Sequence, residues 1–154
     1  MSLNKKPETS KPGGKHHHPA IGGHPMIHGS CLCKSIQFTI QGTLRASRFC
    51  YCVHCTKYAG TSPATWAMAE SATLEVNARG DIKKFNSGRG LRCFCTTCGC
   101  PVWFESIEHP EIVAIPLGVL DDGDIPAPEM HIFTQSKPSW CRIHDDLPQH
   151  QTYP

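Results

Sequence analysis

Two short cysteine motifs, Cys31-Leu32-Cys33 and Cys95-Thr96-Thr97-Cys98, lie far apart in the sequence and together supply four thiols. Residues two apart in an extended segment point to the same face, so Cys31 and Cys33 can direct both sulfurs toward one ion. A C-x-x-C turn lets Cys95 and Cys98 do the same. Four thiolates close a tetrahedral zinc site, and the energy of binding such an ion is also energy of folding.

A third motif, Cys50-Tyr51-Cys52-Val53-His54-Cys55, places three thiols in one local segment. No fourth ligand is obvious nearby. His54 is the nearest candidate, and Cys93 or Cys100 could close the site if the fold brings one of them close. A closed site would be structural, whereas an open one could bind a further ligand.

The charge of a three-cysteine zinc site favours thiol chemistry. Three thiolates over-neutralise the dication, so the ion would be a weaker Lewis acid than one held by neutral histidines, and poor at making hydroxide. It remains a good host for a further soft ligand. A thiol bound there would be held as a nucleophilic thiolate at neutral pH.

Composition predicts one small domain that depends on metal. The chain has 154 residues, 39% of them apolar, with 13 Gly and 13 Pro. A modest core with many turns suits a fold pinned by metal. We find no apolar stretch typical of a signal peptide or of a membrane span, so we expect a cytoplasmic protein without a membrane partner. Its ten cysteines would stay reduced there and bind metal rather than form disulfides.

The charge argues against nucleic acid as a partner. The formal net charge of +2 counts no thiolates, and two zinc ions bound by seven thiolates would make the chain slightly negative. A nucleic-acid binder is expected to carry a clustered basic patch instead. The oligomeric state does not follow from the sequence.

Residues 1–26 are rich in Lys, Pro, Gly and His, which predicts a flexible tail, and we expect the zinc domain over residues 27–154. Alternation and turn residues predict short strands in this domain. They are expected at 35–40, 63–69, 73–77, 83–86, 90–94, 102–105, 112–117 and 130–134. One or two helical turns are expected at 53–59 and a turn at 120–124. The sequence therefore predicts an all-β fold with few short helical turns.

In order and spacing, the cysteine motifs resemble those of the glutathione-dependent formaldehyde-activating enzyme family, which includes the domain of centromere protein V. The resemblance runs from about Gly29 to Leu147. The residues that carry it are Gly29-Ser30-Cys31-Leu32-Cys33, Cys50-x-Cys52-x-x-Cys55-x-Lys57-x-x-Gly60 and Arg92-Cys93-Phe94-Cys95-x-x-Cys98-Gly99. His131 and Asp145 lie in further segments that match.

The resemblance implies a zinc-stabilised β-tent fold with two small antiparallel sheets. It implies a structural zinc on Cys31, Cys33, Cys95 and Cys98, and a catalytic, more labile zinc on Cys50, Cys52 and Cys55. It also implies an activity, the synthesis of S-(hydroxymethyl)glutathione from glutathione and formaldehyde. This is a carbon–sulfur lyase reaction run in the synthetic direction, with a small-molecule thiol as the partner.

Some residues depart from the family pattern. Tyr51 stands where many members have His, and Cys100 follows the last motif where a small residue is more usual. Cys93 and Cys141 are additional thiols. These differences leave two other functions open: a non-catalytic zinc scaffold that binds a protein, and redox chemistry at Cys93, Cys100 or Cys141.

Several other side chains have both a functional and a structural interpretation. Trp66, Trp103 and Phe104 could line a pocket, but aromatic residues in strands usually belong to the core. Arg92 and Lys57 could bind a substrate carboxylate, but a surface cation is the more common role. His54 and Tyr58 lie beside the three-cysteine motif and could donate protons.

Overall fold

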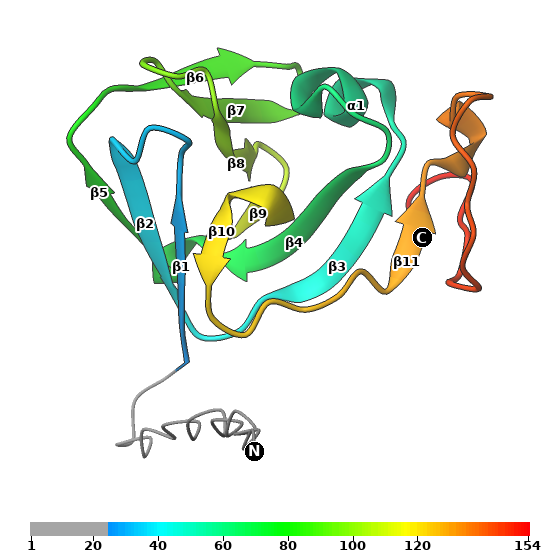
Figure 1. Cartoon of the computed structure of the whole chain (residues 1–154), viewed down its shortest axis with the longest axis horizontal. Helices are drawn as coiled ribbons and strands as arrows, with labels where there is room; N and C mark the ends of the chain where they lie inside the picture. The colour runs from blue at the N-terminus through cyan, green and yellow to red at the C-terminus, as the bar shows by residue number, and fades with distance from the viewer. Residues whose placement is uncertain (1–24) are drawn as a thin grey trace, which may run out of the picture.

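The computed structural model describes residues 25–154, which form two β-sheets and few short helices (Figure 1). This confirms the predicted all-β class. The predicted tail at 1–26 lies outside the described residues, apart from Pro25 and Met26. Over residues 25–154, no helix has the length and apolar character needed to cross a membrane.

The smaller sheet has four antiparallel strands in the order β10-β1-β2-β5. Their bounds are β1 Met26–Ser30, β2 Ile36–Gln41, β5 Leu74–Ala78 and β10 Leu120–Asp122. The prediction of a turn at 120–124 is therefore wrong for its first three residues. They pair with β1, and the Asp122 carboxylate lies 2.6 Å from Nδ1 of His28 on that strand. A cross-strand partner of this kind lets an acidic residue occupy an edge strand.

The larger sheet has seven strands in the order β11-β3-β4-β9-β8-β7-β6. Their bounds are β3 Arg45–Cys50, β4 Ala64–Glu70, β6 Ile82–Asn86, β7 Gly90–Cys95, β8 Pro101–Ser106, β9 Ile112–Pro116 and β11 Met130–Ile132. All neighbouring pairs are antiparallel except β3 and β11, which run parallel. Helix α1 spans Val53–Ala59 as predicted, and short 3₁₀ helices lie at Ser71–Thr73, Leu117–Val119 and Thr134–Ser136.

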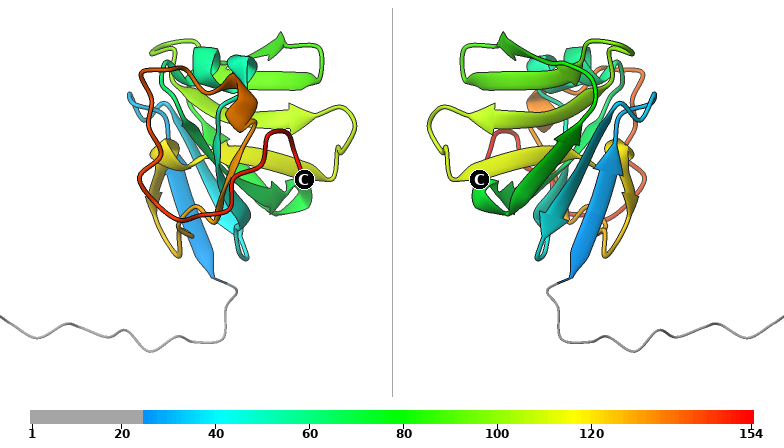
Figure 2. Two further views of the ribbon diagram at one scale, coloured as in Figure 1. Left: turned by 90° about the vertical axis from the view of Figure 1, so that its right-hand side faces the viewer. Right: turned by 90° about the vertical axis from the view of Figure 1, so that its left-hand side faces the viewer.

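The main core lies between the two sheets, which Figure 2 shows from both sides. Alternation along β2 places Ile36, Phe38 and Ile40 on the buried face. Phe38 packs edge-on against Trp103 of the larger sheet, with ring centroids 5.9 Å apart. The strands approach closely at Gly29, where an added Cβ would lie 2.2 Å from the Phe38 ring. Apolar burial therefore joins the sheets in addition to any metal.

Strand β3 was not predicted, because a bulge breaks its alternation. The register with β4 shifts between Arg45 and Arg48, and Ala46 has a positive φ of 49°. As a result Ser47 and Arg48 are both buried although they are adjacent in sequence. Bulges redirect side chains in this way and are common beside functional sites.

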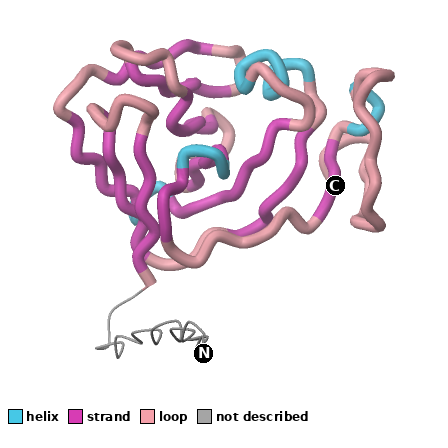
Figure 3. The backbone as a smooth tube through the Cα atoms, in the orientation of Figure 1, coloured by secondary structure: helices cyan, strands magenta, loops and turns pink. Residues whose placement is uncertain are grey.

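The segment after β11 is mostly loop (Figure 3), and near Gln149 it lies beside β11 and runs parallel to it. The His131 N–H donates to the Pro148 carbonyl, and the His150 N–H donates to the His131 carbonyl, both at 2.8 Å. These bonds fix the last residues of the chain beside β3 and β11. They bring Tyr153 next to Arg48, with which it hydrogen-bonds.

Candidate metal centres

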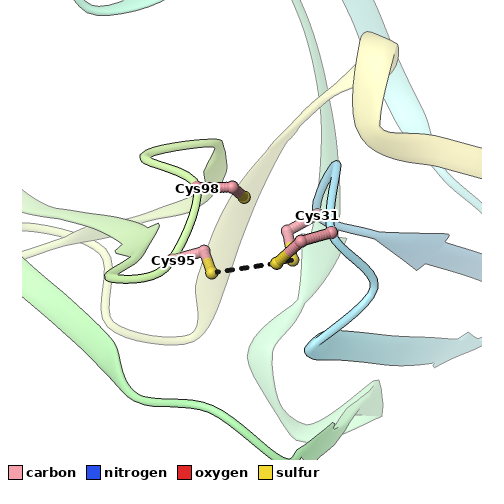
Figure 4. Close-up of side chains that lie close together, drawn as sticks. Cys31, Cys95 and Cys98 are labelled. Carbon is pink, nitrogen blue, oxygen red and sulfur yellow. Dashed lines mark hydrogen bonds between the residues drawn. The ribbon is translucent and has the colours of Figure 1, made fainter.

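The first cluster joins the two sheets through four cysteines. Cys31 and Cys33 lie in the turn between β1 and β2, Cys95 ends β7, and Cys98 lies in the turn that follows. Their sulfur atoms all lie within 4.8 Å of one another. In Figure 4 the labelled Cys31, Cys95 and Cys98 direct their side chains into one space between the two turns.

The sulfur spacing of this cluster fits a tetrahedral zinc ion. The Cys31 and Cys33 sulfurs are 3.5 Å apart, and those of Cys33 and Cys95 are 3.8 Å apart. Four sulfurs at the usual zinc–sulfur bond length would lie about 3.8 Å from one another. In addition, the Ile36 N–H donates to the Cys31 sulfur at 3.3 Å, as is common around metal-bound thiolates.

Ser35 supports the same cluster and was missed by the sequence analysis. Its hydroxyl lies 3.1 Å from the sulfur of Cys33 and 3.2 Å from that of Cys95. Hydrogen bonds from Ser35, and then from the backbone N–H of Cys98, lower the pKa of Cys95 to about 6. The thiolate needed for metal binding is therefore favoured near neutral pH.

The second cluster is local and sits where β3 passes into α1. Cys50 ends β3, Cys52 caps the helix and Cys55 lies in its first turn. The sulfur of Cys52 accepts from the Cys55 N–H at 3.4 Å, and Gly60 ends the helix with a φ of 66°. The three sulfurs lie within 4.8 Å of one another, so this group could also hold a metal ion.

The three thiols ionise unequally. The pKa of Cys52 is well below its ordinary value because the thiols of Cys50 and Cys55 donate hydrogen bonds to its sulfur. The pKa of Cys50 is correspondingly raised by these contacts with Cys52 and Cys55, and by burial. One thiolate with two thiol neighbours is a suitable starting point for capture of a soft metal ion, which displaces the remaining protons.

No fourth ligand joins these three sulfurs among residues 25–154. Only the sulfurs of Cys50, Cys52 and Cys55 lie within 4.8 Å of one another in this part of the described structure. His54 lies on the exposed side of α1. The sulfur of Cys93 faces a Glu105 oxygen at 3.6 Å, and that of Cys100 faces the Pro101 carbonyl at 3.4 Å.

A cavity of about 550 Å³ opens beside the three-cysteine cluster, over one face of the larger sheet. Trp66 and Phe104 line it, whereas Trp103 lies in the main core. The expectation that these aromatic residues belong to the core therefore holds for Trp103 and also for Trp66, which is 4% exposed in a second apolar cluster, whereas Phe104 is only partly buried. The apolar part of the wall is formed by Trp66, Met68, Phe104, Ile112, Ala114, Ile132 and Phe133.

Two buried arginines also line this cavity. Arg92 is only 6% exposed, so its interpretation as a surface cation is wrong. Its guanidinium lies over the rings of Tyr58 and Phe104, 5.0 and 5.1 Å from their centroids, and Nη2 is 4.0 Å from the Cys55 sulfur. Arg48 is equally buried, and the sequence analysis missed it because the β3 bulge hid its direction. Its alternation with Cys50 along β3 was the only available signal.

The other candidates lie away from the cavity or are engaged elsewhere. Lys57 is exposed to solvent. The Tyr58 hydroxyl donates to the Cys93 carbonyl at 2.7 Å, and burial raises its pKa, so its proton is not available at the three cysteines. The thiol of Cys141 donates to the Ser62 carbonyl at 3.4 Å.

A hydrogen-bonded chain that is buried at Tyr51 and His131 and reaches the exposed Asp145 holds the segment between Cys50 and Cys52. The Tyr51 hydroxyl lies 3.1 Å from Nδ1 of His131, and Nε2 of His131 lies 2.9 Å from the Asp145 carboxylate. Tyr51 and His131 are each 2% exposed. The chain connects the three-cysteine segment to β11 and to the C-terminal segment, which the sequence motifs alone did not reveal.

These features define a small cysteine-rich β-protein with one four-sulfur cluster and one three-sulfur cluster that faces a cavity. The family model described as "Glutathione-dependent formaldehyde-activating enzyme" matches residues 26–136, and the chain belongs to this family. Nothing among curated proteins matches it. A crystal structure of a Rhodobacter sphaeroides protein is similar, with 22% identity and a TM-score of 0.49, over 61% of this chain and 87% of the other.

Proposed function

We propose that the chain is a zinc-dependent carbon–sulfur lyase that joins a thiol, glutathione first of all, to formaldehyde. Family membership supports the two reactants. The observation that carries the proposal is the contrast between the clusters: four sulfurs surround one position, whereas three sulfurs border a cavity large enough for a small peptide. We place the protein in the cytoplasm, where its thiols would stay reduced.

The residues present fit zinc at both clusters. Cys31, Cys33, Cys95 and Cys98 would hold a structural ion, and Cys50, Cys52 and Cys55 a catalytic one that is retained less firmly. When bound at the three cysteines, zinc would supply an open position that accepts the substrate sulfur as a thiolate. The buried Arg92 guanidinium lies next to Cys55 and would offset the excess negative charge of the thiolates.

The reaction itself is an addition without oxidation or reduction. The sulfur electron pair forms the new carbon–sulfur bond, the carbonyl π bond breaks, and the thiol proton ends on the resulting hydroxyl. We assign the movement of this proton to His54, whose side chain lines the cavity and is open to solvent. The apolar wall around Trp66 and Phe104 would exclude water from the reacting carbon and hold the two reactants together.

The cavity favours this function over a non-catalytic scaffold, which would not need an apolar recess beside an incomplete ligand set. Redox chemistry at the leftover cysteines has less support. Burial, and then the charge of Glu105, raise the pKa of Cys93 to about 12, so its thiol stays protonated at neutral pH. Cys141 is also buried.

The test combines zinc counting with a direct assay. Native mass spectrometry should find two zinc ions per chain and a further mass of one glutathione when that thiol is added. Nuclear magnetic resonance with ¹³C-labelled formaldehyde should show faster formation of S-(hydroxymethyl)glutathione than in buffer. Cys52→Ser should lose the second zinc and the rate enhancement, while Cys141→Ser should retain both. A Cys52→Ser protein that matches the parent in rate would contradict the proposal.

A further inference from the structure

The wall of the cavity contains buried hydrogen-bond donors without acceptors. Nη1 of Arg92 and Nε1 of Trp66 are both buried and have no hydrogen-bond partner among the described residues. The two side chains are 6% and 4% exposed, and both line the cavity. A buried donor left without a partner costs free energy, so an acceptor supplied by a ligand is the simplest compensation.

The two arginines also lack a carboxylate partner. Across residues 25–154, neither Arg48 nor Arg92 takes part in an ion pair. Arg48 donates to the neutral Tyr153 hydroxyl at 3.2 Å and lies over its ring. The acidic residue of the cavity wall, Glu108, is exposed and pairs with Arg89 instead. Two buried cations therefore face the cavity without a countercharge of their own, apart from the thiolates beside Arg92.

The strand register places the arginines on two sides of the three-cysteine cluster. Arg48 precedes Cys50 by two residues on β3, so the two side chains share one face about 7 Å apart along the strand. Trp66 of β4 lies directly opposite Arg48. Arg92 belongs to β7, beyond β4, β9 and β8 in the sheet, and reaches Cys55 from that side. A ligand sulfur at the three cysteines would have one guanidinium on each side.

We propose that Arg92 and Arg48 are the specificity-determining residues of the cavity and bind two carboxylates that flank the sulfur of the substrate. The cavity would thus select thiols with an anionic group on either side, such as a short peptide with a carboxylate near each end. This rests on the proposed function, because it assumes that the sulfur lies at Cys50, Cys52 and Cys55.

The contacts of Arg92 suit this role. The rings of Tyr58 and Phe104 lie 5.0 and 5.1 Å from the guanidinium and limit its motion, while the edge that carries Nη1 has no hydrogen-bond partner among the described residues. A planar edge of this kind binds carboxylates through paired N–H donors. Arg48 would exchange the weak Tyr153 contact for a charged acceptor, and Nε1 of Trp66 lies on the neighbouring strand to donate to the same carboxylate. The apolar surroundings strengthen each of these contacts.

The test uses S-methylglutathione, which keeps both carboxylates but has no free thiol. Titration calorimetry on the zinc-loaded full chain should detect its binding. The diethyl ester of S-methylglutathione should bind at least about 10-fold more weakly. Arg92→Met and Arg48→Met should each weaken S-methylglutathione binding about 10- to 100-fold, and Arg92→Lys should recover part of the loss. Arg45→Met is the matched control, because Arg45 lies on the same strand but is exposed and pairs with Glu70.

A second comparison separates this inference from the proposed function. The unaltered protein should bind glutathione more tightly than S-methylglutathione, and Cys52→Ser should remove most of this difference, because only the free thiol can occupy the position at the three cysteines. Equal affinity for the ester and the free acid in the unaltered protein would overturn the inference even if no arginine variant folds. So would tight binding of 2-mercaptoethanol with no effect of either arginine substitution, although the proposed thiol chemistry would then survive. Binding of S-methylglutathione without any thiol-dependent gain would refute the proposed function and leave the carboxylate sites standing.

Discussion

The two cysteine clusters use the same ligand atoms but differ in how the chain supplies them. The four-cysteine cluster draws two sulfurs from each of two turns that are 62 residues apart, where Cys33 approaches Cys95. The three-cysteine cluster comes from one segment of six residues and borders a cavity. A cluster that closes a long loop contributes to folding, because it ties together parts of the chain that separate on unfolding. A local cluster contributes less to folding and is free to serve chemistry.

Loss of the four-cysteine cluster should have the largest effect. Cys95→Ser removes a fully buried ligand that connects the sheets, and binding of a structural zinc in small domains is worth on the order of 10 kcal/mol. We expect the variant to be largely unfolded at 25 °C and to show no cooperative transition when it is heated, as followed by circular dichroism. A melting curve like that of the parent protein would show that the two clusters do not differ in this way.

Loss of the three-cysteine cluster should abolish activity but preserve the fold. Cys55→Ser removes one sulfur of the local site. It leaves the main core between the sheets untouched, because Cys55 is partly buried and packs against the second, smaller apolar cluster instead. We expect one zinc per chain, no acceleration of thiol addition, and an unfolding free energy within about 2 kcal/mol of the parent. Complete unfolding of this variant would mean that both clusters are structural.

The buried chain behind the three cysteines should have a smaller effect on both properties. Tyr51→Phe removes the hydroxyl that meets Nδ1 of His131, leaving a buried polar atom without a partner. We expect the free energy of unfolding, measured with urea, to fall by about 1–3 kcal/mol, and the second zinc to be released faster to a chelator. The double variant Tyr51→Phe with His131→Phe is the control. If stability depends on the unsatisfied nitrogen, the double variant should be no less stable than the single one.

Removal of the Ser35 hydroxyl should have the smallest effect and should act on the four-cysteine cluster alone. Ser35→Ala deletes hydrogen bonds to the sulfurs of Cys33 and Cys95. Loss of such an outer contact typically lowers metal affinity about 10-fold. Competition with a chelator should show weaker retention of the first zinc and unchanged retention of the second. An equal change at both sites would indicate a general effect on the fold.

Local patterns in the sequence predicted the elements whose structure depends on local interactions. Alternation located strands such as β2, and the helical turns at Val53–Ala59 appeared where expected. No strand was predicted at β1, at β3, where the bulge at Ala46 replaces alternation by two adjacent buried residues, or at β10, whose acidic residues depend on a partner in β1. At β3 and β10, pairing with a distant strand overrides the local preference.

The residues of the two metal centres and the cavity also divide into those that local spacing predicted and those that depend on distant contacts. Spacing within each motif predicted the pairs Cys31/Cys33 and Cys95/Cys98 and the group at 50–55, and the family resemblance implied that the two pairs share one site. The role of Arg92 could not be read from its position, since the same residue type is usually exposed. Arg48 and Ser35 could be assigned to their sites only once the strands were paired, because the alternation of Arg48 with Cys50 does not show which face of β3 lines a cavity.

The sequence by itself determined the two cysteine pairs and the group of three, because ligands within one turn or one extended pair are bound to lie close together. The meeting of Cys33 and Cys95, 62 residues apart, depends on the packing of the two sheets. Only the tertiary structure decided what those thiols face. The pairing of β3, β4 and β7 in one sheet directs Arg48, Trp66 and Arg92 into the same cavity, and the main core draws Cys93 away from it. Those positions depend on contacts between residues far apart in the chain, which no local pattern encodes.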